Sequence, residues 1–288
     1  MEKNIPFIHS KEKKTFPGFP AFVPGSVWLV GAGPGDPGLL SLLGYYALTE
    51  ADDIVYDALV SEEILHWAND KAIKHPAGKR GGSPSAKQVD ITEKLISLAT
   101  SGRKVLRLKG GDPFIFGRGS EEAIALALAE VPFRMVPGIT AAVAGLAYAG
   151  IPITDRHFNS AVTFITGHEA GGGPPENLDW RALASGSPVL IFYMALKNLD
   201  WMTKQLIKAG LDGETPVILI SKATTEDQQI LETKLVSAAM DVKVSKLEAP
   251  AIVAIGDIVE LRAALDPNAL PHTRAVAARK IISSREIK

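Results

Sequence analysis

The sequence contains no cysteine, and this absence excludes several kinds of chemistry. Without a thiol the chain cannot form a disulfide, use a thiolate nucleophile or bind a metal through sulfur. The six histidines are scattered, and no pair of them has the spacing of metal ligands on a helix, so we expect no metal site. A chain without cysteine also fits a reducing compartment, which favours a cytoplasmic location.

Long apolar runs and a strong net charge are lacking as well. No window approaches the roughly 20 apolar residues needed to cross a bilayer, and the N-terminal segment has no apolar core of the length that a signal peptide needs. The formal net charge is -1, so no global basic field attracts nucleic acid or an anionic membrane. We therefore expect a cytoplasmic protein that binds neither nucleic acid nor membrane.

The chain of 288 residues, 46% of them hydrophobic, is long enough for two ordinary domains. In the first half, helical segments alternate with four strand-like ones, SVWLVGAG, DDIVYDAL, KVLRLKGG and PFRMVPG, which predicts a mostly parallel sheet. The strand-like segments of the second half are AVTFITGH, SPVLIFYMAL, TPVILISKAT, QQILETKL and APAIVAIGD. The pattern restarts after residue 150, where QQILETKL follows its neighbouring strand too closely for a helical crossover, which predicts a partly antiparallel, mixed sheet. We predict two α/β domains in series with a cleft between them. The expected boundaries are a flexible N-terminal arm over 1–24, α/β domains over 25–150 and 151–266, and a basic C-terminal tail over 267–288.

The first glycine-rich turn, GAGPGDPG, only partly matches a dinucleotide-binding fingerprint. Gly31 and Gly33 are in register, but Asp36 stands where a third glycine is expected, and its carboxylate would repel a pyrophosphate at a helix N-terminus. Pro34 also removes a backbone N–H from the turn. An NAD-dependent oxidoreductase is therefore a disfavoured alternative.

Two later strand ends carry similar small residues. KVLRLKGGDP places Gly110, Gly111 and Asp112 after an apolar strand, and VPGITAA places Thr140 and Ala141 at the start of a helix. Because the carboxyl ends of parallel strands share one edge of a sheet, these turns should form a platform there, where open α/β sheets bind ligands.

Basic side chains are concentrated near the same turns. Residues 79–118 hold nine basic side chains against three acidic ones. Lys79, Arg80 and Arg118 stand beside glycines in loops at expected strand ends, where such side chains suit carboxylate or phosphate recognition. The segment lacks interleaved stacking aromatics, so nucleic acid is not the expected partner.

Several motifs together resemble one enzyme family, the uroporphyrinogen-III C-methyltransferases among the tetrapyrrole methyltransferases. They occur in family order over roughly residues 25–265: GAGPGDPGLLSLLG, YDALV, GKRGGSPSAKQVDI, RLKGGDPFIFGRGSEE, VPGITAAVAGLAYAGIPITDR, YMAL and EAPAIVAIGD. The resemblance implies two α/β domains that bind S-adenosylmethionine between them, a homodimer, and release of S-adenosylhomocysteine. It implies two methylations of uroporphyrinogen III, giving precorrin-2 by way of precorrin-1, which feeds siroheme or cobalamin biosynthesis.

The resemblance also implies roles for particular residues. Substrate handling points to Arg118, Glu121, Arg156 and Met194, with Lys79 and Arg80 added from the basic loop. Arg118, Glu121 and Asp57 are the catalytic candidates. Ser120 and Ala223 stand where the family often has glycine, and Glu226 replaces a common proline. The implied cofactor contacts are Pro34, Gly110, Gly111, Asp112, Ile115, Thr140, Ala141, Met194, Ala223 and Ala251.

The implied chemistry needs neither a serine nucleophile nor a metal. A sulfonium is a strong methyl donor and the pyrrole carbons of a porphyrinogen are nucleophilic, so positioning of the two reactants supplies most of the catalysis. The substrate carries eight carboxylates, which Arg118 and Arg156 suit. An arginine seldom acts as a base, so the proton acceptor stays open. Two further alternatives also stay open: a methyltransferase of the same superfamily acting on a later corrin intermediate, and a non-catalytic tetrapyrrole carrier.

Overall fold

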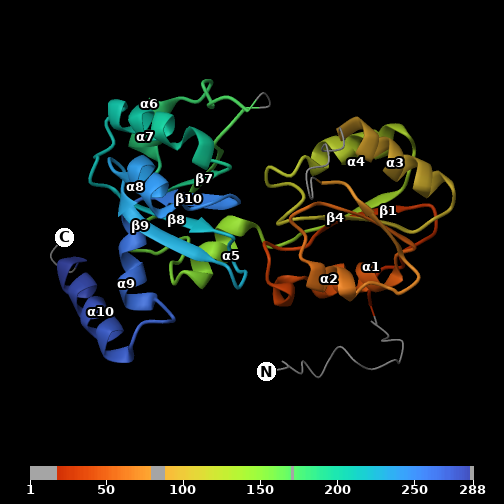
Figure 1. Ribbon diagram of the computed structural model, residues 1–288, viewed down its shortest axis with the longest axis horizontal. Coiled ribbons are helices and arrows are strands. Elements are labelled where there is room, and N and C mark those ends of the chain that lie inside the picture. Colours follow the sequence, from red (N-terminus) through yellow and green to blue (C-terminus); the bar gives the residue numbers. More distant parts are fainter. Residues whose placement is uncertain (1–17, 79–87, 170–171, 286–288) are drawn as a thin grey trace. The chain divides into compact units, whose positions relative to one another are not determined.

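The computed structural model describes residues 18–78, 88–169 and 172–285. The chain forms two compact units, Met1–Thr140 and Ala141–Lys288, each built around a five-stranded sheet (Figure 1). The α/β class predicted from the sequence is confirmed, with a parallel sheet in the first unit and a mixed sheet in the second. The first unit ends before the boundary predicted near residue 150.

The sheet of the first unit has the strand order β3-β2-β4-β1-β5, and every neighbouring pair is parallel. Four of these strands coincide with predicted ones. The sequence IKHP of β3 was not predicted as a strand, because it lies at the edge of the sheet, is largely exposed and lacks apolar alternation. The five strands are β1 (Val27–Gly31), β2 (Asp53–Tyr56), β3 (Ile73–Pro76), β4 (Val105–Lys109) and β5 (Phe133–Val136).

Helices cover both faces of this sheet. The helices α1 (Leu42–Glu50) and α2 (Glu62–His66) lie on one face, and α3 (Gln88–Thr100) and α4 (Gly119–Leu128) lie on the other (Figure 1). Ser41 and Ser61 cap α1 and α2 by accepting hydrogen bonds from backbone N–H groups. Between β1 and α1, the chain forms the short 3₁₀ helix η1 (Pro37–Leu39).

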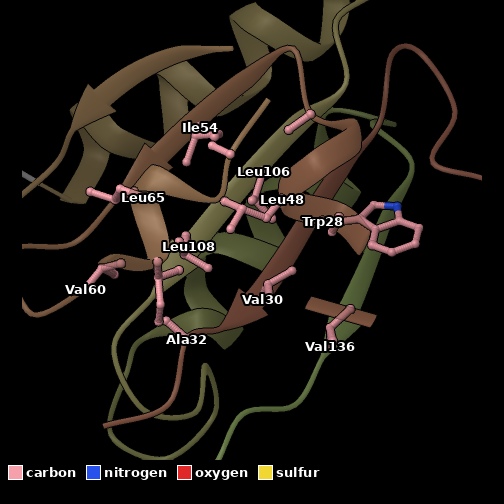
Figure 2. Close-up of a cluster of buried hydrophobic side chains, with 14 of the residues drawn as sticks. Trp28, Val30, Ala32, Leu48, Ile54, Val60, Leu65, Leu106, Leu108 and Val136 are labelled. Atoms are coloured by element: carbon pink, nitrogen blue, oxygen red, sulfur yellow. The ribbon is translucent and has the colours of Figure 1, made fainter. Parts of the chain in front are cut away.

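Alternate residues of each strand face the two helical layers. The even-numbered Trp28, Val30, Leu106 and Leu108 pack with α1 and α2 in the cluster shown in Figure 2. The odd-numbered side chains of the same strands face α3 and α4 instead. With helical side chains such as Leu95 of α3 and Leu126 of α4, they form a second apolar cluster, whose strand members include Val27, Leu29, Val55 and Val105.

The segment predicted as a flexible arm, 1–24, is described from Gly18 onward. Phe22 is only 3% exposed and stacks on Trp28 with a ring-centroid distance of 4.6 Å. Phe19 contacts Tyr46 edge to face. The last residues of this segment therefore belong to the core of the first unit, because burial of their aromatic rings outweighs the proline-rich character that predicted an arm.

The sheet of the second unit has the strand order β6-β7-β10-β8-β9. The pair β6–β7 is parallel and the other pairs are antiparallel, which confirms the antiparallel pairing predicted for QQILETKL. The five strands are β6 (Thr163–Thr166), β7 (Leu190–Tyr193), β8 (Pro216–Ser221), β9 (Gln229–Lys234) and β10 (Ala251–Ile255).

One face of this second sheet packs against α6 (Trp180–Gly186), α7 (Leu199–Lys208) and α8 (Ala238–Ser245). On the opposite face, Gly145 of α5 (Ala141–Tyr148) lies close to the side chains of Ile220 and Ile252. The chain then continues through four shorter or terminal elements: η2 (Leu196–Asn198) before α7, and η3 (Asp257–Leu261), α9 (Arg262–Leu265) and α10 (Pro271–Arg285) after β10.

The helix α10 occupies most of the segment predicted as a basic tail, 267–288. It packs against α9. No helix in the described ranges combines the length and apolar character that crossing a membrane requires.

Candidate functional site

Three glycines meet where β1, β4 and β5 end. A Cβ added to Gly31 would lie 2.5 Å from the carbonyl oxygen of Gly111 and 2.5 Å from the Cα of Gly138, distances at which no side chain fits. Gly111 also adopts φ +67°, a left-handed conformation that favours glycine. The three strand ends that the sequence predicted to share an edge are therefore brought together, with main chain touching main chain.

Hydrogen bonds lock these strand ends in place. Gly33 and Gly111 exchange two backbone hydrogen bonds of 3.2 and 2.7 Å. The carboxylate of Asp112 accepts one hydrogen bond from Phe114 N at 2.8 Å and another from Gly138 N at 3.0 Å. Asp112 therefore ties the turn after β4 to the turn after β5, a positioning role that the sequence alone does not reveal.

The carboxylate of Asp36 caps η1 by accepting a hydrogen bond from Gly38 N at 2.7 Å. It occupies the helix N-terminus at which a dinucleotide enzyme would bind a pyrophosphate. The geometry thus agrees with the sequence argument against an NAD-dependent oxidoreductase. An open pocket of about 370 Å³ lies beside this turn. The pocket is lined by Gly38, Leu39, Leu40, Ser41, Pro137, Gly138 and Ile139.

Four ionisable side chains form a cluster below the same edge, which we call the β4 cluster: Asp57, Arg107, Lys109 and Glu122. Arg107 and Lys109 are two residues apart on β4, so both point toward α4, where Glu122 is completely buried. Its Oε1 accepts hydrogen bonds from Arg107 Nε at 3.1 Å and from Lys109 Nζ at 3.1 Å. Gln88 Nε2, at the start of α3, donates a third at 3.0 Å.

Asp57 lies at the outer end of the β4 cluster, directly after β2. Its Oδ1 accepts a hydrogen bond from Arg107 Nη2 at 2.5 Å, and its Oδ2 lies 3.9 Å from Lys109 Nζ. Asp57 is 31% exposed, whereas Arg107 and Lys109 are 2% and 3% exposed. Burial lowers the pKa of Lys109, and the nearby charge of Arg107 lowers it further, against the opposing effects of Asp57 and Glu122.

Glu122, Arg107 and Lys109 were not predicted as members of one site. A glutamate in the first turn of a helix usually serves the helix dipole at the surface. The available signal was two cations on one face of an otherwise apolar strand, VLRLK. Such side chains are seldom buried without a counter-ion, so an anion on a covering helix was to be expected.

The turn between β4 and α4 presents the candidates Arg118 and Glu121. They form a two-pronged ion pair, with Arg118 Nε and Nη2 at 2.8 and 2.7 Å from the Glu121 carboxylate oxygens. Both side chains are more than half exposed. The Arg118 hydrogen bond lowers the pKa of Glu121, and Glu121 in turn raises the pKa of Arg118. Arg118 adopts φ +59°, a strained conformation of the kind found at functional sites.

Ile115 lies in the same turn, half-buried between the exposed rings of Phe114 and Phe116. The remaining candidates of the first unit lie at its sheet edge, with Pro34 after β1 and the buried Thr140 after β5. The predicted substrate-binding residues Lys79 and Arg80 lie outside the described residues.

In the second unit, Arg156 is exposed in a turn that Asn159 holds in shape. Asn159 accepts a hydrogen bond from Asp155 N and donates to the carbonyls of Ile153 and Ala161. Among the described residues no ion pair joins Arg156 to Asp155, the partner that a purely structural role would suggest. Asp155 instead accepts a hydrogen bond from His157 N at 2.9 Å.

The other candidates of the second unit gather at one edge of its sheet. Met194 directly follows β7, Ala223 follows β8, and Ala251 begins β10 opposite Ser221. Met194 is exposed and has φ +55°. Ala141 begins α5. The methyl group of Ala223, where the family often has glycine, lies against Gly145 of α5, at which a Cβ would approach it to 3.0 Å.

No cluster of three or more metal-ligating side chains exists within the ranges that the structure describes. In each unit taken by itself, the candidate residues lie in main-chain turns at one edge of its sheet or in exposed loops, among small residues and charged side chains. This arrangement suits a group-transfer enzyme that positions two organic reactants.

Residues 26–239 match the family model of the tetrapyrrole (corrin/porphyrin) methylases, and the chain belongs to this family. It is 56% identical over 251 residues to a uroporphyrinogen-III C-methyltransferase of Sinorhizobium sp, covering 87% of this chain and 90% of that protein. It is also 48% identical over 237 residues to a siroheme synthase of Sodalis glossinidius, covering 82% of this chain but only 50% of that longer protein.

A solved structure is similar over the same region. It is the uroporphyrin-III C-methyl transferase from Thermus thermophilus complexed with S-adenyl homocysteine, with 35% sequence identity and a TM-score of 0.70. The match covers 82% of this chain and 99% of the other. The family expected from the sequence motifs is therefore confirmed.

Proposed function

We propose that the protein is an S-adenosylmethionine-dependent C-methyltransferase that methylates uroporphyrinogen III twice, giving precorrin-2 by way of precorrin-1. The observation that carries this proposal is the 56% identity, over 90% of its length, to the Sinorhizobium enzyme of that name. The strand ends support it, because close-packed main-chain turns lie there and the arginines Arg118 and Arg156 are exposed.

The residues present fit the methyl donor. A Cβ added to Gly31 or Gly138 would lie 2.5 or 2.2 Å from the carbonyl oxygen of Gly111, so the strand ends meet through glycine, and this edge keeps the space that a nucleoside and an amino acid would need free of these side chains. When bound, S-adenosylmethionine supplies an electrophilic methyl group and leaves as S-adenosylhomocysteine. We assign its binding to Pro34, Gly110, Gly111, Asp112, Ile115, Thr140, Ala141, Met194, Ala223 and Ala251.

The carboxylates of the substrate need cations, and exposed arginines supply them. Arg118 and Arg156 are both exposed and suit two-pronged carboxylate binding, so we assign them to the substrate, together with Lys79 and Arg80. Glu121 holds the Arg118 guanidinium in one orientation until a substrate carboxylate competes for it. The exposed Met194 offers an apolar contact to the macrocycle.

A proton must leave the substrate after each methyl transfer, and Asp57 is the side chain best suited to accept it. Arginine seldom deprotonates, and both carboxylate oxygens of Glu121 are engaged by Arg118. Asp57 is a partly exposed carboxylate at the sheet edge, held from below by Arg107. We therefore assign Asp57 as proton acceptor, and Arg118 with Glu121 as the groups that orient the reacting ring.

We further propose a cytoplasmic homodimer whose product feeds siroheme or cobalamin biosynthesis. Similarity to a siroheme synthase supports the first of these pathways, and the absence of cysteine fits the cytoplasm. Light scattering coupled to size-exclusion chromatography tests the dimer, for which a mass of one chain, 30.7 kDa, would be the contrary result.

The proposed reaction is tested by anaerobic incubation of the pure protein with uroporphyrinogen III and methyl-labelled S-adenosylmethionine. Mass analysis of the tetrapyrrole should show a gain of two labelled methyl groups. Transfer of no label to uroporphyrinogen III, with transfer to a later corrin intermediate, would instead support a different member of the same family.

Arg118→Ala tests the substrate site within the same assay. Loss of a two-pronged charged contact should lower kcat/KM by roughly 10- to 100-fold. Stability should change by less than about 1 kcal/mol, because exposed ion pairs contribute little. The control is Lys204→Ala, which removes another exposed ion pair, that with Asp200 on α7, and should leave kcat/KM unchanged. Equal activity in the two variants would remove Arg118 from the site.

A further inference from the structure

The β4 cluster poses a physical problem that the proposed catalytic roles do not address. Arg107, Lys109 and Glu122 are almost completely buried, and buried charges are expensive unless they are paired and hydrogen-bonded. Replacing such a group with a packed apolar residue is often neutral or stabilising. A purely structural role therefore explains poorly why two cations and an anion lie beneath the sheet edge.

Hydrogen bonds of Arg107 connect Glu122 with Asp57 across the β4 cluster. Glu122 Oε1 fixes the Nε side of the Arg107 guanidinium, which leaves Nη2 directed at Asp57 Oδ1. Arg107 Nη1 lies 3.4 Å from the carbonyls of Val55 and Leu108, which hold the guanidinium plane. Arg107 therefore has one orientation, and the carboxylate outside it is held at one place on the sheet edge.

Charge balance makes Glu122 necessary to this arrangement. With Asp57 and Glu122 ionised and both cations protonated, the charges of the β4 cluster sum to zero. From the neighbouring elements, α3 adds the neutral Gln88, and His75 of β3 binds Asp53 rather than Asp57. Glu121 of α4 pairs with Arg118. Without Glu122, the two buried cations would share the single carboxylate of Asp57.

We infer that Glu122 is a positioning residue: through Arg107 and Lys109 it sets the orientation and the charge environment of Asp57. The inference rests on the proposed function only in so far as Asp57 is assigned to the reaction. Glu122 itself is completely buried and acts through the two cations. Its Oε2 has no hydrogen-bond partner within the described part of the chain. Both cations therefore donate a hydrogen bond to the same oxygen, Oε1.

Three variants separate a charge effect from a packing effect. Glu122→Gln keeps the side-chain shape and removes one negative charge, whereas Lys109→Met removes one positive charge. The double variant Lys109→Met/Glu122→Gln restores the original charge sum and leaves the Arg107–Asp57 pair. Glu93→Gln, at an exposed position of α3, is the matched control for the amide substitution.

The first measurement is the pH titration of the Asp57 carboxyl by carbon-13 NMR, in protein labelled at aspartate side chains and without substrate. Asp57→Asn assigns the signal. Added positive charge favours the ionised carboxyl, so the titration should move to lower pH in Glu122→Gln and to higher pH in Lys109→Met. It should return close to the wild-type position in the double variant and stay there in Glu93→Gln.

The second measurement is the pH dependence of kcat for methyl transfer, whose acid limb should move in the same opposite directions. Glu122→Gln should lower kcat by at least tenfold while changing the Kd for S-adenosylhomocysteine by less than threefold. Equal shifts of one sign in both single variants, or a loss of kcat that follows only the loss of thermal stability, would overturn the inference.

The two measurements distinguish failure of the inference from failure of the proposed function. If wild-type protein transfers no methyl group to uroporphyrinogen III, the proposed function fails, while the NMR titration still decides whether Glu122 controls Asp57. If methyl transfer occurs but the Asp57 titration is the same in all variants, the inference fails and the proposed function stands. If Glu122→Gln does not fold, the other two variants still test the inference. The titration of the Asp57 carboxyl should be shifted in Lys109→Met and should return close to the wild-type position in the double variant.

Discussion

At the scale of single residues, a second buried carboxylate shows how this chain uses ionic contacts away from the candidate site. Asp53 at the start of β2 is only 1% exposed. It accepts hydrogen bonds from His75 Nε2 at 2.7 Å and from Arg103 Nε at 2.6 Å. Burial favours the neutral acid, but the hydrogen bonds and charges of His75 and Arg103 outweigh burial, so the pKa of Asp53 is lowered from its ordinary value.

Asp53→Asn is expected to lower the free energy of unfolding at pH 7 by about 2 kcal/mol, because a buried, charge-assisted acceptor is lost. Since the pKa of Asp53 is lowered on folding, its stabilisation is present above the unfolded pKa of about 3.9 and is lost as the pH falls. Urea denaturation should therefore show a difference from wild type at pH 7 that shrinks below about pH 4. Asp70→Asn, at an exposed position, is the control and should show neither effect.

Gly31→Ala tests the close packing of the strand ends. The added Cβ would lie 2.5 Å from main-chain atoms of Gly111 and Gly138, and backbone cannot move aside as a flexible side chain can. We expect a loss of about 3 kcal/mol in the free energy of unfolding, together with weaker binding of S-adenosylhomocysteine by calorimetry. Gly186→Ala, where no atom lies within 4 Å of the added Cβ, should match wild type. Unchanged stability in Gly31→Ala would show that the strand ends can separate.

At the scale of elements, Asp112 connects two strand ends that are not adjacent in the sheet, since β1 lies between β4 and β5. Asp112→Asn keeps the size of the side chain but replaces one acceptor with a donor that faces a backbone N–H. We expect the Kd for S-adenosylhomocysteine to rise roughly tenfold, which corresponds to about 1.4 kcal/mol.

The control for this prediction is Asp212→Asn in the second unit. Asp212 accepts a hydrogen bond from Glu214 N at 2.9 Å, the same local contact that Asp112 makes with Phe114. Among the described residues, no side-chain hydrogen bond of Asp212 connects two strand ends. The Kd of Asp212→Asn for S-adenosylhomocysteine should therefore equal that of the wild type. An equal loss of affinity in both variants would mean that the local turn, rather than the link between strands, matters for binding.

The elements also show how far the sequence could predict this protein. Strands with buried, β-branched residues, such as β1, β4, β8 and β10, were predicted because their apolar side chains and flanking turns leave a clear pattern. The exposed edge strand β3 and the short helices α2 and α6 were not. The helix α6 has no fully buried residue, and a five-residue helix such as α2 is too short to show a period.

The candidate site could be predicted to the extent that main-chain geometry depends on glycine. The glycine-rich strand ends predicted a shared platform at one edge of the sheet, and the strand ends do meet there, although the close approach of the main chain at Gly31 and Gly138 was not predicted. The roles of the carboxylates were harder to predict, because an acidic residue near a helix N-terminus can cap the helix, bind a cation or connect two turns. Glu122 serves two buried cations, whereas Asp36 caps a turn and Asp112 connects two turns. Only tertiary neighbours distinguish these roles.

At the scale of the whole molecule, the first unit contains everything that its sheet needs. All five strands, β1 to β5, and both apolar clusters lie before residue 141. A fragment 1–140 is therefore expected to fold alone and unfold cooperatively on heating, as followed by circular dichroism, and to transfer no methyl group because Met194, Ala223 and Ala251 are missing.

A fragment 1–130 is the matched control. It lacks β5, so β1 loses one of its two partner strands and the backbone acceptor at Pro132, and a buried strand becomes an unpaired edge. We expect no cooperative transition from it. If fragment 1–140 behaved in the same way, the first unit would depend on the second for its stability.

The interlocked strand ends have a further consequence for how this protein can change over evolutionary time. The contact between Gly31, Gly111 and Gly138 is made by the main chain. Side-chain substitutions at other positions therefore leave this contact in place. Side chains in the turn after β4, such as Phe114 and Arg118, are exposed, and substitutions at exposed positions usually cost little stability. Evolution can therefore change ligand specificity through the side chains of this turn while the main-chain geometry of the three strand ends stays the same.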